Sequence, residues 1–199
     1  MRIVITGTSG VGKTYLEQLL AAEYGFFQLP KTTSRDKRPQ EIEGQGIKFA
    51  SKTEINNNLK DFFFCLNYAG NIYCWENKDL QAHKDCTMAI TMESLTDLIK
   101  LDLKFIPILL YLDQSHLDLL DKRIRKQLDY DKLNQKERIQ ADLKIKERLQ
   151  LASKELAQIA KYIEIVNAAN YGRSFLIKDD DTLYQEVIPY ILSLQKIIT

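Results

Sequence analysis

The sequence predicts an α/β fold in which helices cover both faces of a parallel sheet. Two observations lead to this prediction. A strand, a glycine-rich loop and a helix follow one another at the start of the chain, and apolar runs then alternate with helical patterns. The longest apolar run, residues 105–112, is far shorter than the roughly 20 residues that span a bilayer. A chain of 199 residues can bury one core and carry a small inserted subdomain.

The composition is typical of a soluble globular protein, with 45% hydrophobic and 28% charged residues. The formal net charge of +1 gives no overall field that would attract nucleic acid or an anionic membrane, so we expect neither as a partner. No apolar leader with a cleavage site precedes the glycine-rich loop, which favours a cytoplasmic location. The three cysteines form no C-x-x-C pair, and we expect free thiols at Cys65, Cys74 and Cys86.

Residues 7–14 read G-T-S-G-V-G-K-T and fit the pattern G-x-x-x-x-G-K-S/T of a P-loop. An apolar run at residues 2–6 precedes this loop, and leucines at helical spacing follow it, so the loop joins a strand to a helix. Glycines let successive backbone N–H groups turn around a phosphate, and the helix N-terminus adds partial positive charge.

The motif therefore predicts a P-loop NTPase-type sheet with a nucleoside triphosphate site. Lys13 would reach the β- and γ-phosphates, and the Thr14 hydroxyl would hold Mg²⁺. The candidate ATP-binding residues of the loop are Gly7, Thr8, Ser9, Gly10, Val11, Gly12, Lys13 and Thr14.

The segment after the first helix predicts short strands. Residues 25–29 are apolar and end at a proline, whereas residues 31–46 are polar, charged and glycine-bearing, which indicates a loop. The letters S-K-T-E at residues 51–54 have the spacing of a capping box and open a short helix. Aromatic and apolar strands at residues 62–68 and 72–75 flank a glycine turn, which predicts a hairpin.

The second half of the chain alternates between helices and strands. Its predicted helices span residues 77–83, 93–100, 115–161 and 183–198. Its predicted strands are the apolar runs at residues 87–91, 104–112 and 162–167. A short break at D-Y-D, residues 129–131, divides the longest helical segment into two helices.

Residues 32–49 resemble the acceptor-binding loop of guanylate kinases, which reads T-T-R-x-x-R-x-x-E-x-x-G followed by an aromatic pair. Residues 70–73 read G-N-I-Y and look like the G-N-x-Y turn of that family. Arg123 and Arg148 resemble its lid arginines, and residues 165–167 look like the I-V-N strand near its adenine site. These pieces and the P-loop keep the order that they have in the family.

An acceptor monophosphate carries close to two negative charges, and two arginines three residues apart on a loop can bind its oxygens. Arg35 and Arg38 fit that task, and Tyr73 could donate its hydroxyl to the same phosphate. The resemblance implies acceptor-binding roles for Thr32, Thr33, Ser34, Arg35, Arg38, Glu41 and Tyr73.

The resemblance also implies a lid that closes over the triphosphate and offsets charge on the transferring group. It places Asn167 with the ATP-binding residues, and the implied catalytic residues are Lys13, Arg35, Arg123 and Arg148. The implied organisation is one domain, with a core at about residues 1–30 and 86–199, an acceptor-binding β subdomain at about 31–85 and a lid at about 115–148.

The sequence departs from the family at the base-reading site. Guanylate kinases carry a glutamate six residues before the glycine of G-N-x-Y, and here that residue is Phe64. The pair after G-N-x-Y is Cys74 and Trp75 instead of glycine and a small hydroxyl residue. The expected phosphate-binding tyrosine is Ile47, and Thr91 or Met92 stands where an aspartate is expected. A buried glutamate specifies guanine strongly, which Phe64 cannot do.

These residues predict an ATP-dependent phosphotransferase, a nucleoside monophosphate kinase that uses Mg²⁺, with GMP as the default acceptor. A kinase of the type that phosphorylates ribose 1,5-bisphosphate is an alternative, since it needs no base pocket. A non-catalytic guanylate kinase-like binding module is a third reading, although such modules usually lose the P-loop lysine and Lys13 is present. We expect a monomer or a homodimer.

Overall fold

A five-stranded parallel sheet forms the centre of the protein in a computed structural model that describes residues 1–37, 41–179 and 181–198. The strand order is β2–β7–β1–β8–β9, and every neighbouring pair is parallel. The strands are β1 (Arg2–Gly7), β2 (Phe27–Gln28), β7 (Cys86–Ala89), β8 (Phe105–Tyr111) and β9 (Arg173–Leu176). The predicted α/β class with a parallel sheet is confirmed.

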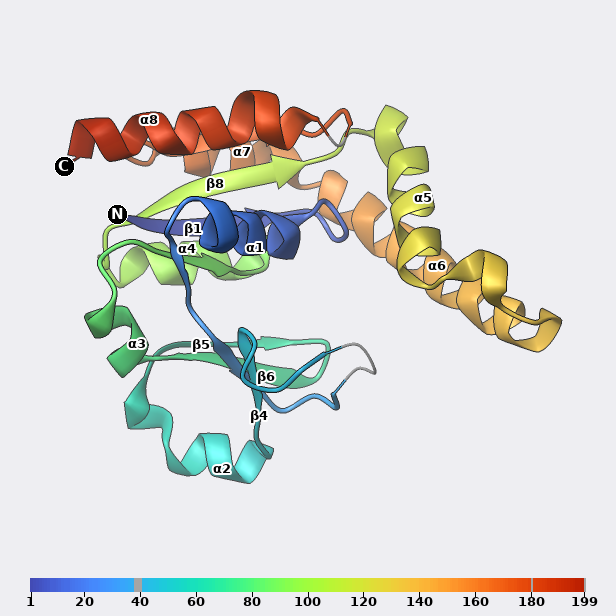
Figure 1. The fold of residues 1–199 in the computed structure, drawn as a ribbon, viewed down its shortest axis with the longest axis horizontal. Helices are drawn as coiled ribbons and strands as arrows, with labels where there is room; N and C mark the ends of the chain where they lie inside the picture. Colours follow the sequence, from blue (N-terminus) through green and yellow to red (C-terminus); the bar gives the residue numbers. More distant parts are fainter. Residues whose placement is uncertain (38–40, 180, 199) are drawn as a thin grey trace.

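Helices cover both faces of this sheet (Figure 1). One face packs against α1 (Lys13–Glu23) and α8 (Ile188–Ile198), and the other against α4 (Met92–Lys100) and α7 (Ile159–Ala168). A hydrophobic core lies on each face of the sheet, and alternate residues of β1 point into one or the other. Ile3 and Ile5 belong to the core beneath α1 and α8, and Val4 belongs to the core beneath α4 and α7. Strands buried on both faces have continuous apolar sequences, which explains the runs that predicted β1 and β8. A wider π-helical turn, η4 (Leu183–Val187), leads into α8.

A second, four-stranded sheet lies beside the core in the order β4–β3–β6–β5. Its strands are β3 (Lys31–Thr33), β4 (Ile47–Phe49), β5 (Phe62–Tyr68) and β6 (Asn71–Glu76). The predicted hairpin is β5–β6, and the predicted capping box opens α2 (Lys52–Asn57), with η1 (Leu59–Asp61) after it. Helix α3 (Asn77–Ala82) leads back to the core. These elements lie inside the segment predicted as the acceptor-binding subdomain.

The predicted loop at residues 31–46 is wrong at its start, because Lys31–Thr33 forms β3. This short, polar strand is held between β6 on one side and β4 on the other. It forms a strand because it pairs with distant segments, of which the nearer begins 16 residues away, where Ile47 pairs with Lys31. Local sequence propensity does not predict such pairing.

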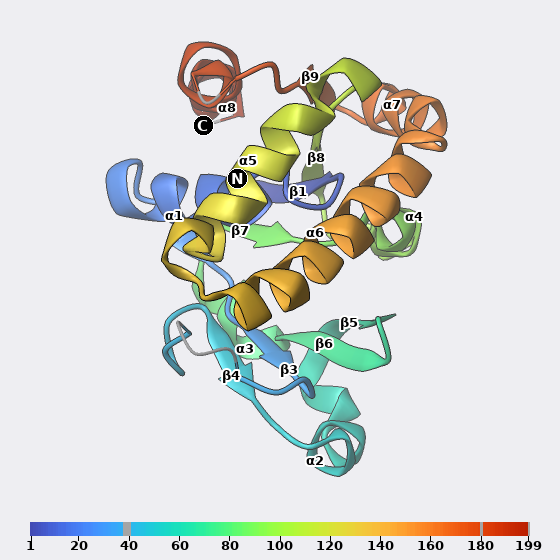
Figure 2. The same ribbon diagram turned by 90° about the vertical axis from the view of Figure 1, so that its right-hand side faces the viewer.

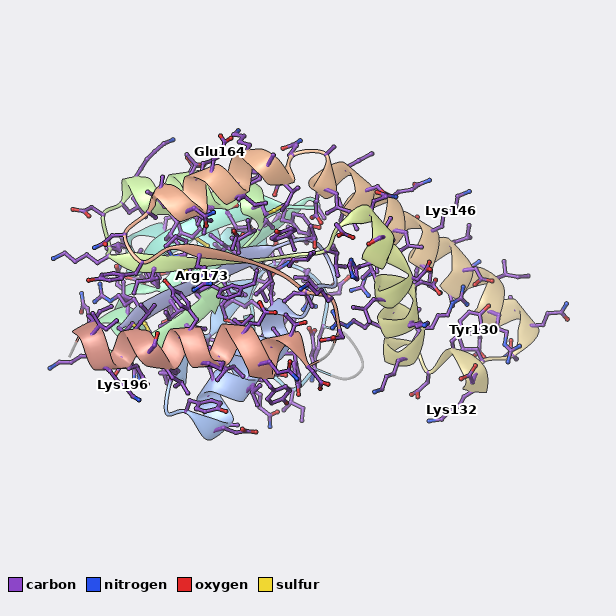
Figure 3. The ribbon with its side chains drawn as sticks, turned by 90° about the horizontal axis from the view of Figure 1, so that it is seen from above. Tyr130, Lys132, Lys146, Glu164, Arg173 and Lys196 are labelled. Carbon is purple, nitrogen blue, oxygen red and sulfur yellow. A yellow bond between two sulfur atoms is a disulfide. The ribbon has the colours of Figure 1, made fainter. Side chains whose placement is uncertain are left out.

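Two helices extend from the carboxyl end of β8 and project beyond the core (Figures 1 and 2). After η2 (Gln114–His116) they are α5 (Leu117–Gln127) and α6 (Gln135–Leu156), joined through η3 (Tyr130–Lys132). The predicted break at residues 129–131 is confirmed, since Asp129 has a positive φ of 49° and ends α5. Figure 3 shows Tyr130 and Lys132 at the tip of this helical pair, away from the sheet. Among the residues that the structure describes, no helix is both long and apolar enough to cross a membrane.

The predicted strand at residues 162–167 is wrong, because this segment lies in α7. Tyr162 and Val166 are its buried residues, and their separation of four is the helical period. The β-branched residues Ile163, Ile165 and Val166 favour strands locally, but packing against β8 and β9 selected the helix. The last strand of the sheet is β9, which no pattern predicted.

The expectation of three free thiols is also wrong. Cys65 and Cys74 form a disulfide across β5 and β6, and Cys86 is free and buried. The hairpin register places the two cysteines directly opposite each other, with their Cα atoms 4.1 Å apart. The sequence carried this signal: one cysteine lies four residues before Ala69 and the other four residues after Gly70, the two residues of the turn.

We expect one reactive thiol, that of Cys86, when protein purified without reductant is denatured and treated with a chromogenic thiol reagent. After reduction the same titration should give three, because the cross-strand pair then reacts as well. The variant Cys86→Ser is the control and should give none before reduction. Three thiols in wild-type protein that was never reduced would contradict the disulfide.

Candidate active site

The P-loop follows the carboxyl end of β1 and turns on three glycines with positive φ, Gly7 (144°), Gly10 (76°) and Gly12 (108°). A Cβ at Gly7 would lie 1.8 Å from the carbonyl oxygen of Leu110 in β8, so only glycine fits between the strands there. Gly12 is the N-cap of α1, and the loop therefore ends at a helix N-terminus. This is the strand, loop and helix order that the motif predicted.

The Lys13 ammonium lies within the loop. Its Nζ donates to the carbonyl oxygen of Gly7 at 2.7 Å and to that of Thr8 at 2.9 Å. Burial lowers the pKa of Lys13 from 10.5 to about 8, while the carboxylate of Glu155 opposes the shift most. A polyphosphate beside this ammonium would favour its charged form.

Thr14 lies in the first turn of α1, and its side chain is exposed next to Lys13. In the described part of the chain, no group of three or more His, Cys, Asp or Glu side chains could hold a metal ion. A hydroxyl oxygen is a ligand that Mg²⁺ accepts, and the exposed Thr14 side chain beside Lys13 fits an ion that phosphate oxygens and water would otherwise ligate.

The Arg35 guanidinium lies between two of the predicted partners. Its two terminal nitrogens pair with both carboxylate oxygens of Glu41, at 2.7 Å for Nη1 to Oε2. This contact and a hydrogen bond with Tyr73 raise the pKa of Arg35, and the guanidinium also lies 5.6 Å from the centre of the Phe49 ring. Arg35, Glu41 and Tyr73 thus lie together in the structure. Arg38 lies outside the described residues.

The neighbouring residues tie this loop to the hairpin. Ser34 donates its backbone N–H to the carbonyl oxygen of Ile72 at 3.0 Å, and its Oγ accepts from the Ile72 N–H at 2.9 Å. Thr33 pairs with Tyr73 in the sheet and therefore faces the same side. Thr32 pairs with Cys74 and faces the other side, where it lines a cavity of about 390 Å³ beneath α2. Thr32 is therefore not on the face that carries Tyr73.

The two predicted lid arginines lie on α5 and α6. Arg123 donates from Nη1 to the carbonyl oxygen of Val11 at 3.2 Å, which brings α5 directly onto the P-loop. Arg148 lies near Tyr68 of β5: burial raises the pKa of this tyrosine and the arginine opposes the rise. Arg123 thus contacts the P-loop, and Arg148 lies near Tyr68, which Glu155 also affects.

Asn167 lies at the end of the sheet that carries the P-loop, two strands away from β1. It lies in the last turn of α7, where its Oδ1 accepts from the backbone N–H of Ser174 at 3.2 Å and from the Ser174 hydroxyl at 3.1 Å. Ser174 of β9 is level with Leu109 of β8, which is level with Thr6 of β1, the residue before Gly7. The parallel register therefore places Asn167 and the P-loop at the same end of the sheet.

Two buried carboxylates in the site were missed from the sequence. Glu155 of α6 is 9% exposed and accepts from the Ser9 N–H of the P-loop at 2.5 Å. Glu17 of α1 is 2% exposed, and Gln28 donates to it at 3.4 Å. Glu155 lies on the buried face of α6, beside Ala152. Glu17 lies on the buried face of α1, between Leu16 and Leu20. A charged residue on a buried stripe is the signal that could have found them.

The base-reading positions lie in the core. Phe64 is 7% exposed and packs against Trp75, with ring centres 6.0 Å apart. Ile47 is buried, and Thr91 is the N-cap of α4, where its hydroxyl is hydrogen-bonded to that of Ser94 at 2.9 Å. No carboxylate therefore replaces the family's glutamate at the position of Phe64.

Comparison with known proteins gives the same family. The family model described as guanylate kinase matches residues 1–167. The guanylate kinase of Synechococcus elongatus is 36% identical over 74 residues, which are 36% of this chain and 40% of that protein. The guanylate kinase of Clostridium tetani is 43% identical over 75 residues, 36% of this chain and 35% of that protein. The chain thus matches less than half the length of these relatives.

A solved structure is similar over most of the chain. The crystal structure of guanylate kinase from Anaplasma phagocytophilum matches with a TM-score of 0.63, over 97% of this chain and 85% of that chain. Its sequence identity is 14%, so this likeness shows the fold.

Glu17 should make stability depend on pH. Burial raises its pKa from 4.5 to about 7, so the folded protein holds a proton there that the unfolded chain has lost. The free energy of unfolding should therefore fall as pH rises from 4.5 to 7, by up to about 3 kcal/mol, and stay at the lower level above pH 7. The variant Glu17→Gln should remove this dependence and be more stable than wild type at pH 8 in urea denaturation.

The control for this experiment is Glu23→Gln, since Glu23 is exposed on the same helix. It should follow the wild-type pH profile. An equal stability difference between wild type and Glu17→Gln at pH 5 and pH 8 would contradict the assignment.

Proposed function

The chain belongs to the guanylate kinase family, and from this premise we propose that it is a nucleoside monophosphate kinase that transfers the γ-phosphoryl group of ATP to an acceptor monophosphate. The observation that carries the proposal is the contact of Arg123 with the P-loop at Val11. This contact brings the Arg123 guanidinium of α5 to the loop that holds the Lys13 ammonium. The third basic side chain, Arg35, belongs to the predicted acceptor loop after β3.

Phosphoryl transfer between two bound substrates needs no covalent bond to the protein. It requires two phosphates in line, neutralised charge and exclusion of water. The loop amides would hold the donor phosphates, Lys13 would stabilise charge on the transferring group, and Thr14 would ligate Mg²⁺. Arg123 and Arg148 would add positive charge around the transferring phosphoryl group and exclude water as the lid closes.

Arg35 would bind the acceptor phosphate, together with Arg38 and Tyr73. Both terminal nitrogens of Arg35 are paired with Glu41, so an acceptor phosphate would compete with this carboxylate for them. Arginine binds phosphate in bidentate fashion, which would let the phosphate take over both contacts.

The acceptor is proposed to be GMP by default, in line with the family. A second candidate, a small acceptor without a base such as ribose 1,5-bisphosphate, is favoured by two observations. The base-reading position is filled by Phe64, which packs in the core. Lys31 is half-buried and acts electrostatically on both Lys13 and Glu17, so a second cation lies near the P-loop lysine, where it could bind a further anion.

Incubation with ATP-Mg²⁺ and a panel of acceptors, followed by measurement of ADP, tests the proposal. We expect ADP formation that depends on a monophosphate or on ribose 1,5-bisphosphate. The variant Lys13→Ala should lower kcat at least about 100-fold, because it removes a cation from the transferring group. Lys196→Ala is the control, since Lys196 is exposed on α8, far from the lid (Figure 3). Absence of acceptor-dependent turnover would instead support a binding module.

Arg35→Gln should raise KM for the acceptor and lower its kcat/KM about 10- to 100-fold, the cost of one charge-assisted bidentate contact. KM for ATP should stay near the wild-type value. Lys37→Gln removes a neighbouring exposed charge and should change neither constant. Acceptor kinetics unaffected by Arg35→Gln would disprove the clamp.

A further inference from the structure

A carboxylate of α6 lies on the P-loop. The Oε2 atom of Glu155 accepts from the backbone N–H of Ser9 at 2.5 Å, although 146 residues separate the two in sequence. Ser9 belongs to the loop whose amides are the expected ligands of the triphosphate. An anion of the protein itself therefore binds a P-loop donor.

The charges around Glu155 are those that a phosphate would meet. Of the acidic side chains that act on Lys13, Glu155 has the largest effect. Glu93 of α4 faces the same space and acts on Glu155 with like charge, and Tyr68 of β5 lies near both. A triphosphate arriving here would be repelled by the Glu155 carboxylate and would compete with it for Ser9 and Lys13.

The same glutamate lies on the helix that carries Arg148. Glu155 stands seven residues, or about two helical turns, after Arg148 on α6. Between them Ala152 is fully buried, so the end of α6 is packed against the core while Arg148 lies toward the hairpin. Release of Glu155 from the loop would loosen the point at which α6 meets the donor site.

We propose that Glu155 is a phosphate-displaced latch: its carboxylate holds the P-loop through the Ser9 amide, and a triphosphate that binds the loop expels it and frees α6 to carry Arg148 over the donor. The inference rests on the nucleotide site of the proposed function. It makes Glu155 a positioning residue that ties lid movement to the presence of nucleotide. The cost is weaker nucleotide binding, since part of the binding energy displaces the carboxylate.

Calorimetric titration with the Mg²⁺ complex of β,γ-imido-ATP tests the latch in wild type and two variants. Glu155→Gln is isosteric and leaves an amide oxygen that can accept from Ser9, but it removes the charge that repels phosphate. Its dissociation constant should be about tenfold lower than that of wild type. Glu147→Gln removes an exposed charge from the same helix and should leave the constant unchanged. Equal Tm values would show that both variants fold.

A second measurement uses wild type alone and so does not depend on variant folding. In a crystal structure with the imido-ATP complex, Glu155 should have left the Ser9 amide. If the carboxylate still accepts from Ser9 beside bound nucleotide, or if Glu155→Gln binds no more tightly than wild type, the latch is overturned while the nucleotide site stands. If no form of the protein binds the imido-ATP complex, both the latch and the nucleotide site are overturned.

Discussion

The backbone of Gly7 passes so close to β8 that any side chain would collide with the Leu110 carbonyl oxygen. This close approach ends β1 and turns the chain into the loop, and the Thr8 N–H then donates to the same carbonyl at 3.3 Å. The loop is thereby fixed to the middle of the sheet before it reaches α1. Everything that we assign to the donor site depends on this junction, because Lys13, Thr14 and the loop amides take their positions from it.

Around that junction, charge is balanced by the protein itself. Lys13 is neutralised in part by Glu155, and Arg35 by Glu41. A site built for highly charged substrates would otherwise hold unpaired buried cations, which cost free energy. Internal carboxylates thus partly satisfy the cations, and substrate phosphates are expected to take over some of the same contacts. The contacts concerned are those of Glu155 with Ser9 and of Glu41 with Arg35.

The acceptor side differs from the donor side in how it is built. Its sheet is small, and β3 consists of three residues held by β4 and β6. The Cys65–Cys74 disulfide joins β5 to β6 on the face that carries Thr32, opposite the face of Tyr73. Aromatic residues such as Phe64 and Trp75 bind this sheet to the core through packing instead of offering polar groups to a base. This sheet therefore offers polar side chains that could bind a phosphate, whereas the residue at the base-reading position, Phe64, is apolar and buried.

The sequence by itself determined the P-loop, the parallel α/β class, the β5–β6 hairpin and the two lid helices, because each depends on local spacing or turn chemistry. It could not decide the state of residues 162–167, where β-branched residues favour a strand and packing against the sheet selects a helix. It also could not show that Glu155 reaches Ser9, or that Asn167 accepts hydrogen bonds from Ser174 of β9. Those facts depend on which distant segments meet in space, and only the tertiary structure sets that.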